Sequence, residues 1–418
     1  MFTSFSTALS ALNATSTAID VVGNNLANMN STGFKASAMS FSDLVTQSLG
    51  AGLGTTQVGF GTAVPITLRD FSQGAIQTTG GLLNGAISGL GFFIVQDPTS
   101  GNTEYTRAGN FQTDASGNLM TASGDFVQGW TANGSGQINS NLPVSNIVIP
   151  VGALQAPVAT STVSAQLNLN STANSDATST FSTPITIYDS LGTSHVLTLS
   201  FTKTAPNAWT YTATLPSGDL VDPTTAQVAT GNLVFTPAGT LDLTQTATPV
   251  TFQMPALTDG ATSGATITWN LADASGNGTI TQYDQPSASS SSSQDGQAAS
   301  QLVSVGLGNG GSILAQYSDG QQVTVGQVAL ASIRNPDSLV AVGNNNFMLS
   351  AASAAPNIGI PGTGGRGSIQ GGSLEASNVD IATEFTNLIV YQRGYEANGK
   401  VVSTADTLSQ DTINLIQG

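Results

Sequence analysis

Helical apolar periodicity is concentrated at the two ends of this 418-residue chain. Residues 2–29 and 378–417 repeat apolar side chains at spacings of three and four, the period of a helix with one buried face. The sequence between them consists mostly of short alternating segments, turns and connectors rich in Gly and Ser. An apolar helix face must be covered by another element, and these two segments can cover each other. We therefore predict an α+β, mainly β fold, with paired terminal helices in a coiled-coil-like unit and nested β-rich domains.

The N-terminal segment carries a heptad seam that we expect a partner to cover. Its positions are Phe2, Phe5, Leu9, Leu12, Ser16, Ile19, Gly23 and Leu26. The opposite face is built from Ser, Thr and Asn, whose side chains compete for backbone hydrogen bonds and weaken a helix. We expect this helix to be marginal in the free subunit and to become ordered when a partner covers the seam. The alternative is an ordinary amphipathic helix docked on its own domain.

The C-terminal segment opens with a predicted capping box from Ser377 to Asp380, with the hydroxyl at the cap and the carboxylate three residues later. Gly394 and Gly399 further along either allow close helix approach, allow bending, or have no role. A heptad stripe follows the cap at Ile381, Phe385, Leu388, Gln392, Tyr395, Gly399, Val402, Asp406, Ser409, Ile413 and Ile416. From both stripes we predict an assembly interface made of Phe5, Leu9, Leu12, Ile19, Leu26, Ile381, Phe385, Leu388, Tyr395, Val402, Ile413 and Ile416.

The middle of the chain predicts two β-rich regions, one inserted into the other. Between residues 155 and 285 apolar side chains alternate with period two and turn residues separate the runs, as in a β-barrel or sandwich. The Ser-rich run at 287–293 is interpreted as the linker that returns from this insertion. The predicted parts are paired terminal helices at 1–30 and 373–418, a connector at 31–75 and 359–372, a β-rich middle domain at 76–152 and 299–358, and an outer β domain at 153–298.

Composition argues against most kinds of chemistry. The chain has 8 basic residues, a formal net charge of −16, one His and no Cys. It cannot build the basic face that binds nucleic acid or anionic membranes, and it has no apolar run long enough to span a bilayer. The single histidine, His195, has no second His or Cys to join it, so we interpret it as structural or surface-exposed. We expect no catalytic, cofactor or metal site, and export without a cleaved signal peptide.

Two long stretches, one near each end, resemble the signatures of the bacterial flagellar rod and hook family. The first runs from Ile19 to Lys35, and the second begins at Gly372 and continues to Asp406. The positions that we assign to the family motif are Asn24, Asn25, Ala27, Asn28, Gly33, Phe34, Glu375, Asn378, Gln392, Arg393, Ala405 and Asp406. Within the family, the large β insertion and the segment Ile187–His195 are similar to hook proteins, because distal rod proteins are shorter.

This resemblance implies a structural subunit without enzyme activity. Such subunits polymerise with copies of themselves into a curved, flexible tube, the flagellar hook, which couples rod to filament as a universal joint and transmits torque. The resemblance also implies unfolded export through the flagellar type III pathway to an extracellular position. The implied partners are rod, hook-cap and hook–filament junction proteins and the export apparatus. The alternatives are a distal rod subunit of the same family or, outside it, a secreted β-rich binding protein.

Overall fold

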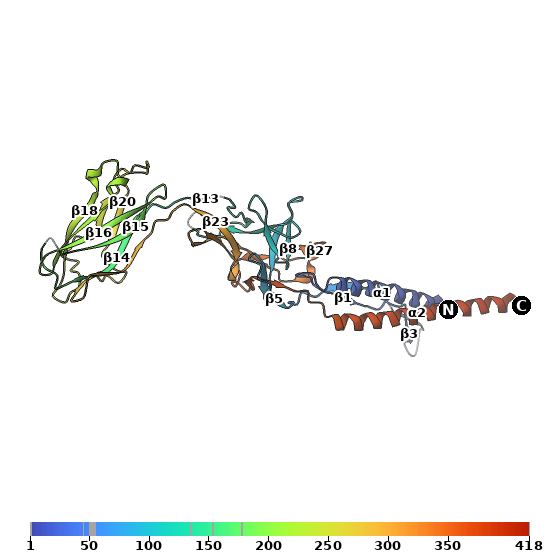
Figure 1. Cartoon of the computed structure of the whole chain (residues 1–418). Coiled ribbons are helices and arrows are strands. Elements are labelled where there is room, and N and C mark those ends of the chain that lie inside the picture. Colours follow the sequence, from blue (N-terminus) through green and yellow to red (C-terminus); the bar gives the residue numbers. More distant parts are fainter. Residues whose placement is uncertain are drawn as a thin grey trace. The chain divides into compact units, whose positions relative to one another are not determined.

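The computed structural model describes residues 2–44, 46–49, 56–133, 136–152, 154–176 and 179–417 (Figure 1). They form two compact units. The terminal unit comprises Met1–Val151, Val303–Gln316 and Gln322–Gly418, and the inserted unit comprises Gly152–Leu302 and Tyr317–Gln321. The terminal unit is therefore assembled from both ends of the sequence.

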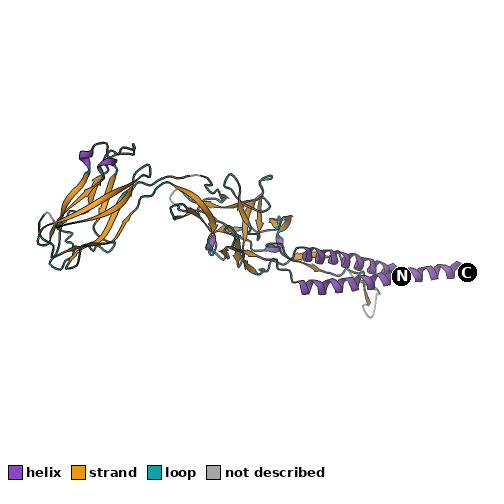
Figure 2. Ribbon diagram, viewed as in Figure 1, coloured by secondary structure: helices purple, strands orange, loops and turns teal. Residues whose placement is uncertain are grey.

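The terminal unit contains two long helices, α1 (Phe2–Ala27) and α2 (Ile381–Gln417), which pack against each other (Figure 2). They run antiparallel, since Asn25 near the end of α1 bonds Glu384 in the first turn of α2. The two helices are 26 and 37 residues long, and the C-terminal part of α2 extends beyond α1. The predicted pairing of the terminal helices is confirmed. Among the described residues, no helix combines the length and the apolar character needed to cross a bilayer.

The start of α2 is capped by a different residue from the one predicted. Asp380 Oδ1 accepts hydrogen bonds from the backbone N–H of Ala382 at 2.8 Å and of Thr383 at 3.3 Å. Ser377, the predicted cap, instead accepts the N–H of Val379 at 3.3 Å in a local turn. A carboxylate suits the cap position because it also meets the positive end of the helix dipole.

The rest of the terminal unit is β-structure. Its strands are β1 (Ser37–Ser40), β2 (Thr46–Leu49), β3 (Thr56–Gly59), β4 (Ile66–Arg69), β5 (Ile76–Thr78), β6 (Gly85–Ser88), β7 (Phe92–Gln96), β8 (Thr103–Thr106), β9 (Phe111–Thr113), β10 (Leu119–Thr121), β11 (Phe126–Thr131), β12 (Ser145–Asn146), β23 (Ser300–Leu307), β24 (Ser312–Tyr317), β25 (Gln322–Val328), β26 (Leu330–Ser332), β27 (Val340–Gly343), β28 (Asn346–Met348), β29 (Asn357–Gly359), β30 (Ser368–Gly371) and β31 (Ser373–Glu375). The main sheet runs β24-β25-β11-β7-β8-β28-β27. Phe92 and Ile94 of β7 pack in its core with Tyr105, Trp130 and Phe347.

The segment at 31–75, predicted as an irregular connector, contains paired strands. β1 pairs with β4, and β2 forms a hairpin with β3. Further along, β5 pairs with β31 and β6 pairs with β30, so the chain leaving α1 lies beside the chain entering α2. The described side chains of β4 are mostly exposed. A strand of this kind lacks the apolar alternation that marks a half-buried strand in sequence.

The inserted unit is a sandwich of two sheets around one core, one of the two predicted alternatives. Its strands are β13 (Leu154–Gln155), β14 (Thr162–Asn170), β15 (Thr180–Tyr188), β16 (Ser194–Ala205), β17 (Ala208–Thr214), β18 (Gln227–Val234), β19 (Val250–Gln253), β20 (Thr266–Asn270), β21 (Ile280–Tyr283) and β22 (Ala288–Gln294). One sheet is β15-β16-β17-β18, and the other is β19-β20-β14-β21 with β22 added beside β14. Alternating side chains such as Leu197, Leu199 and Phe201 are fully buried between them, together with Trp209 and Trp269.

The Ser-rich run is a strand and not the predicted linker. β22 pairs antiparallel with β14, with Ser293 opposite Ser164 and Ala288 opposite Asn168. Nearly all of its side chains are exposed. An edge strand of this kind is held through its backbone, so its serines imitate the composition of a linker.

Candidate functional site

The most buried residues of α1 are small. Ala8, Ala14, Ala18 and Val22 are no more than 3% exposed. Small side chains let two helices approach closely, and a Cβ added at Gly394 of α2 would lie only 3.6 Å from Thr15. The predicted heptad seam, built on the largest apolar residues, is therefore not the most buried face of α1 in the single chain.

Many of the large apolar side chains remain exposed in the single chain. Phe5 and Leu9 of α1 are 40% and 46% exposed, and Phe385 of α2 is 52% exposed. Of the other predicted interface residues, Ile381, Tyr395 and Ile413 are exposed, and Leu12, Ile19, Leu26, Leu388 and Val402 are half-buried. The side chain of Ile416 lies outside the described residues. The predicted interface remains a prediction, and exposed neighbours enlarge the surface it would use: Ile389, Val390, Val401 and Leu408.

Directly after α1, a buried ionic cluster ties both ends of the chain to the β-structure. We call it the clamp: Lys35, Arg107 and Glu375. Lys35 Nζ lies 2.6 Å from Glu375 Oε1, and Arg107 Nη1 lies 3.0 Å from Glu375 Oε2. The three side chains are between 0 and 4% exposed. Lys35 precedes β1, Arg107 follows β8 and Glu375 ends β31, so one carboxylate joins three distant segments.

The remaining polar atoms of the clamp mostly have backbone partners. Lys35 Nζ also donates to the Ser72 carbonyl at 2.5 Å, and Glu375 Oε1 accepts the Gly74 N–H at 2.9 Å. Burial lowers the pKa of Lys35, and the hydrogen bond and charge of Glu375 oppose that effect. Because a buried cation is costly without an anion beside it, the Glu375 carboxylate stabilises both basic side chains in the interior.

Two asparagines of the motif join the helices to the strands. Asn25, fully buried in α1, donates through Nδ2 to the Ser37 carbonyl at 2.8 Å and to Glu384 Oε1 at 2.9 Å. Its Oδ1 accepts the Ser37 N–H at 3.0 Å. Asn378 does the same before α2: its Oδ1 accepts the Ala36 N–H at 2.7 Å, and its Nδ2 donates to the Asp70 carbonyl at 2.9 Å. These amides fix where each helix leaves the β-structure.

Gly33 and Phe34 belong to the same junction. The Gly33 N–H donates to the Glu375 carbonyl at 2.8 Å, and its φ of +68° is a conformation that favours glycine. A Cβ at this position would lie 2.5 Å from the backbone carbon of Arg107, so no larger residue fits. Phe34 is 8% exposed, and its carbonyl accepts the Asn378 N–H at 3.4 Å.

The other motif residues do not join this junction. Asn28 Nδ2 donates to the Asn24 carbonyl at 2.9 Å, which closes the end of α1 locally. The rest lie along the helices, where Ala405 is half-buried and the others are exposed: Ala27, Gln392, Arg393 and Asp406. The predicted motif set therefore divides into a buried junction and positions whose role is not explained within one chain.

The site prediction omitted three residues of the junction: Lys35, Arg107 and Glu384. The sequence offered one signal, because only 8% of residues are charged and each of these three side chains carries a charge. Glu384 belongs to α2, where it is 8% exposed and faces Asn25. Its Oε2 is buried and has no hydrogen-bond partner among the described residues.

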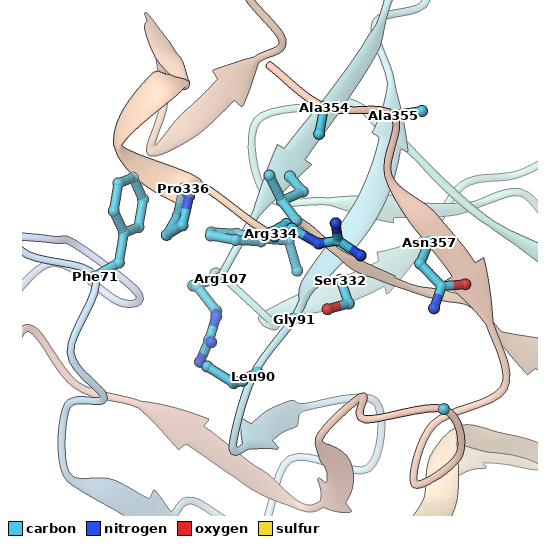
Figure 3. Close-up of a pocket in the computed structure, with 13 residues that line it drawn as sticks. Phe71, Leu90, Gly91, Arg107, Ser332, Arg334, Pro336, Ala354, Ala355 and Asn357 are labelled. Carbon is cyan, nitrogen blue, oxygen red and sulfur yellow. The ribbon is translucent and has the colours of Figure 1, made fainter. Parts of the chain in front are cut away.

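A cavity of about 620 Å³ lies beside the clamp in the terminal unit. Figure 3 shows Phe71, Arg107, Ser332 and Arg334 among its lining residues. Arg107 is already committed to Glu375 and to the Gly89 carbonyl at 2.9 Å. No Asp, Glu, His or Cys is among the lining residues that are described, so general acid–base or thiol chemistry has no side chain to carry it there.

Removing the clamp carboxylate tests its contribution to stability. We expect Glu375→Gln to destabilise the terminal unit by about 3–5 kcal/mol, because it leaves two buried cations without their anion. The matched control is Glu396→Gln on α2, whose carboxylate pairs with Arg393 at 3.1 Å on the surface. That change should cost about 0–1 kcal/mol, as exposed pairs do. Urea unfolding followed by circular dichroism measures both; similar effects of the two variants would contradict the buried-clamp account.

Glu384 makes the junction between the helices sensitive to pH. Burial raises the pKa of its carboxyl above the ordinary 4.5, and the Asn25 hydrogen bond only partly offsets this. The folded chain then binds this proton more tightly than the unfolded chain, so this group costs stability as pH rises through the folded-state pKa. Glu384→Gln removes the charge and keeps the oxygen that Asn25 bonds. We expect this variant to be more stable than the parent at pH 7, with the difference disappearing below pH 4.5. Thermal unfolding across pH measures it, and a variant less stable at pH 7 would refute the assignment.

Four family profiles match the chain in the order in which these elements occur. They are "Flagella basal body rod protein" at residues 5–35, "Flagellar hook protein FlgE/F/G D1 domain" at 86–165, "Flagellar basal body protein FlaE D2 domain" at 154–297, and "Flagellar basal body rod FlgEFG protein C-terminal" at 370–415. The first match covers most of α1 and the start of the junction. The last match covers β31 and most of α2.

Relatives match along nearly the whole length. The chain is 34% identical over 425 residues to the flagellar hook protein FlgE of Salmonella typhimurium, covering 99% of this chain and 100% of that protein. It is 33% identical over 464 residues to that of Treponema pallidum, with coverages of 99% and 100%. The solved structure of the Helicobacter pylori flagellar hook protein FlgE2 matches with a TM-score of 0.53 and 15% identity, covering 70% of this chain and 99% of that one, which supports the fold. The chain belongs to the family of flagellar hook proteins, the structural subunits of the bacterial flagellar hook.

Proposed function

We propose that this chain forms the curved, flexible tube of the hook as a universal joint, transmitting torque from rod to filament. The observation that carries the proposal is the surface of the terminal helices. In one subunit the most buried apolar residues of α1 are mainly alanines, and larger side chains such as Leu9 and Phe385 stay exposed. Burying apolar surface contributes about 25 cal/mol per Å², so a partner that covers this surface is strongly favoured. In a homopolymer that partner is another copy.

Few charges also suit a joint that bends while loaded. Only 8% of residues are charged, and exposed pairs such as Arg393–Glu396 are few among the described residues. Bending requires contacts between subunits to change between arrangements of similar energy. Fixed charge pairs between subunits would favour one arrangement, whereas apolar and hydroxyl surfaces tolerate small shifts. The clamp meanwhile keeps each subunit's own helices attached.

We further propose that the subunit is exported unfolded through the flagellar type III pathway, without a cleaved signal peptide, to an extracellular hook. The weak helix propensity of the α1 polar face supports this, since a helix rich in Ser, Thr and Asn is easily unfolded. In the structure α1 is docked on α2; its disorder in the free subunit stays a prediction. The proposed partners are rod, hook-cap and hook–filament junction proteins and the export apparatus, with no enzyme activity and no cofactor.

The domain division is also kept as a proposal. Residues 1–30 with 373–418 would form the inner tube, and residues 153–298 the outer layer. The regions at 76–152 and 299–358 would lie between them, reached through connectors at 31–75 and 359–372. Such a division gives the apolar helices the most enclosed position, where other copies can cover them on several sides.

A charge placed on the exposed apolar surface tests the assembly proposal. Leu9→Asp adds a carboxylate where Leu9 is 46% exposed, so the single chain should fold normally. Burial of that charge against another copy has no compensating partner, so we expect polymerisation to be lost. The matched control is Asn13→Asp, which adds the same charge at an exposed position of the polar face. Polymerisation is followed by electron microscopy and light scattering. Normal tubes from Leu9→Asp, or an equal loss with Asn13→Asp, would contradict the proposed interface.

A further inference from the structure

The single histidine of the chain lies among three carboxylates in the inserted unit. His195 is the second residue of β16 and its side chain is 5% exposed. Its Nδ1 lies 2.9 Å from Asp219 Oδ2, and its Nε2 lies 3.1 Å from Asp189 Oδ2 and 3.8 Å from Asp259 Oδ2. The three carboxylates come from separate connections. Asp189 follows β15, Asp219 ends a short helical turn (Ser217–Asp219), and Asp259 lies between β19 and β20. This cluster is independent of the terminal helices and the clamp.

A neutral imidazole ring can donate to only one of its two carboxylate neighbours. In the tautomer that carries its hydrogen on Nδ1, that N–H donates to Asp219 Oδ2. Nε2 then carries a lone pair, and it faces the oxygens of Asp189 and Asp259. Ionised carboxylates only accept hydrogen bonds, so in this tautomer three acceptor atoms converge, and either a second ring proton or a cation can bridge them. Asp189 and His195 are buried and Asp259 is exposed, so a cation could enter from the Asp259 side and stabilise the two buried acceptors.

We propose that Asp189, His195 and Asp259 bind a divalent transition-metal ion, with zinc as the best-fitting probe. One ligand atom from each residue lies within 4.8 Å of the other two. Around a tetrahedral zinc ion with bonds of about 2.0–2.1 Å, ligand atoms lie about 3.3–3.4 Å apart. The distances of 3.1 and 3.8 Å from Nε2 to the two carboxylate oxygens bracket that spacing. Small side-chain movements are enough to complete three protein ligands, with water in the fourth position.

Asp219 supplies the feature that distinguishes this cluster from a group of acidic residues. A histidine that binds a metal through one nitrogen usually donates its other N–H to a carboxylate, which orients the ring and raises its basicity. Asp219 holds Nδ1 in that way at 2.9 Å. An imidazole ligand favours zinc and similar ions over calcium or magnesium, which take six or more oxygen ligands.

The bound ion would cross-link two connections at one end of the sandwich, and Asp219 would attach a third through its hydrogen bond to the ring. Hydrogen bonds already join the same connections, because the Thr258 N–H donates to the Asp219 carbonyl at 2.9 Å and the Thr262 N–H donates to Ser190 Oγ at 2.8 Å. Asp189 Oδ1 is held by the N–H of Leu191 at 2.8 Å, which leaves Oδ2 directed at the ring. The proposed ion would therefore raise the unfolding temperature of the inserted unit.

A second ring proton competes with the metal for the same position. An imidazolium would donate from both nitrogens to Asp219 and Asp189 without any metal. Metal binding must then displace that proton, so affinity should rise with pH. Because of this competition, an experiment can distinguish a bound metal ion from a second proton on the ring.

The test uses the full chain without a histidine tag, treated with chelator and titrated with zinc chloride by calorimetry at pH 7.5. We expect one ion per chain, binding at least tenfold weaker in Asp259→Asn, and unchanged binding in the control Asp273→Asn. Asp273 is an exposed aspartate of the same unit, bonded to backbone N–H groups of its own turn at 2.8 and 2.9 Å. Near-ultraviolet circular dichroism of the buried Trp209 and Trp269 confirms that each variant is folded.

A second readout does not depend on any variant. The chain contains one histidine, so ¹⁵N spectra of the imidazole report on His195 alone. Zinc should shift the Nε2 resonance and leave Nδ1 protonated. If the ring keeps both protons in the presence of zinc at pH 7.5, the proposal is overturned, because a proton and not a metal ion then occupies the position between Nε2 and the carboxylates. Equal zinc affinity of Asp259→Asn and Asp273→Asn would overturn it by placing the ion elsewhere.

Discussion

The buried carboxylate of Glu375 is the interaction on which the terminal unit depends. Lys35 and Glu375 are 340 residues apart in sequence, and Arg107 is 268 residues from Glu375, yet their charged atoms meet within 3.0 Å. A carboxylate in an apolar interior is stable only with cations and hydrogen-bond donors beside it, and here each oxygen has a basic partner. Because α1 ends and α2 begins beside this junction, its geometry fixes their antiparallel contact. Asn25 and Asn378 also attach the helices to the β-structure, through hydrogen bonds of their neutral amide groups.

That attachment explains why the helices can leave so much apolar surface open. The most buried residues of α1 are small, and an isolated pair of such helices would be weak. Anchoring both to the β-structure keeps them ordered without using the larger residues. Those residues are then available to other copies of a hook protein. A subunit designed in the opposite way, with Phe5 and Phe385 buried internally, would have little surface left for assembly.

The sequence predicts the elements of this fold better than it predicts their contacts. Periodicity locates α1 and α2, and alternation locates the sandwich strands, because both patterns follow from one buried face. The most buried face of α1 was not predicted, since a heptad search favours large apolar residues, whereas the buried positions here include Ala14 and Ala18. The strand β22 was missed because its serines carry no alternation. The clamp and the His195 cluster join residues that are distant in sequence, and no local pattern specifies which charges meet.

The central claim is that the exposed side of the terminal helices is covered by other subunits while the clamp and its junction stay as they are. Hydroxyl-radical footprinting of the free subunit and of the assembled polymer measures this most directly. The account predicts that Phe5, Leu9, Phe385 and Tyr395 are oxidised in the free subunit and strongly protected in the polymer. Equal oxidation of these four side chains in both states would contradict it.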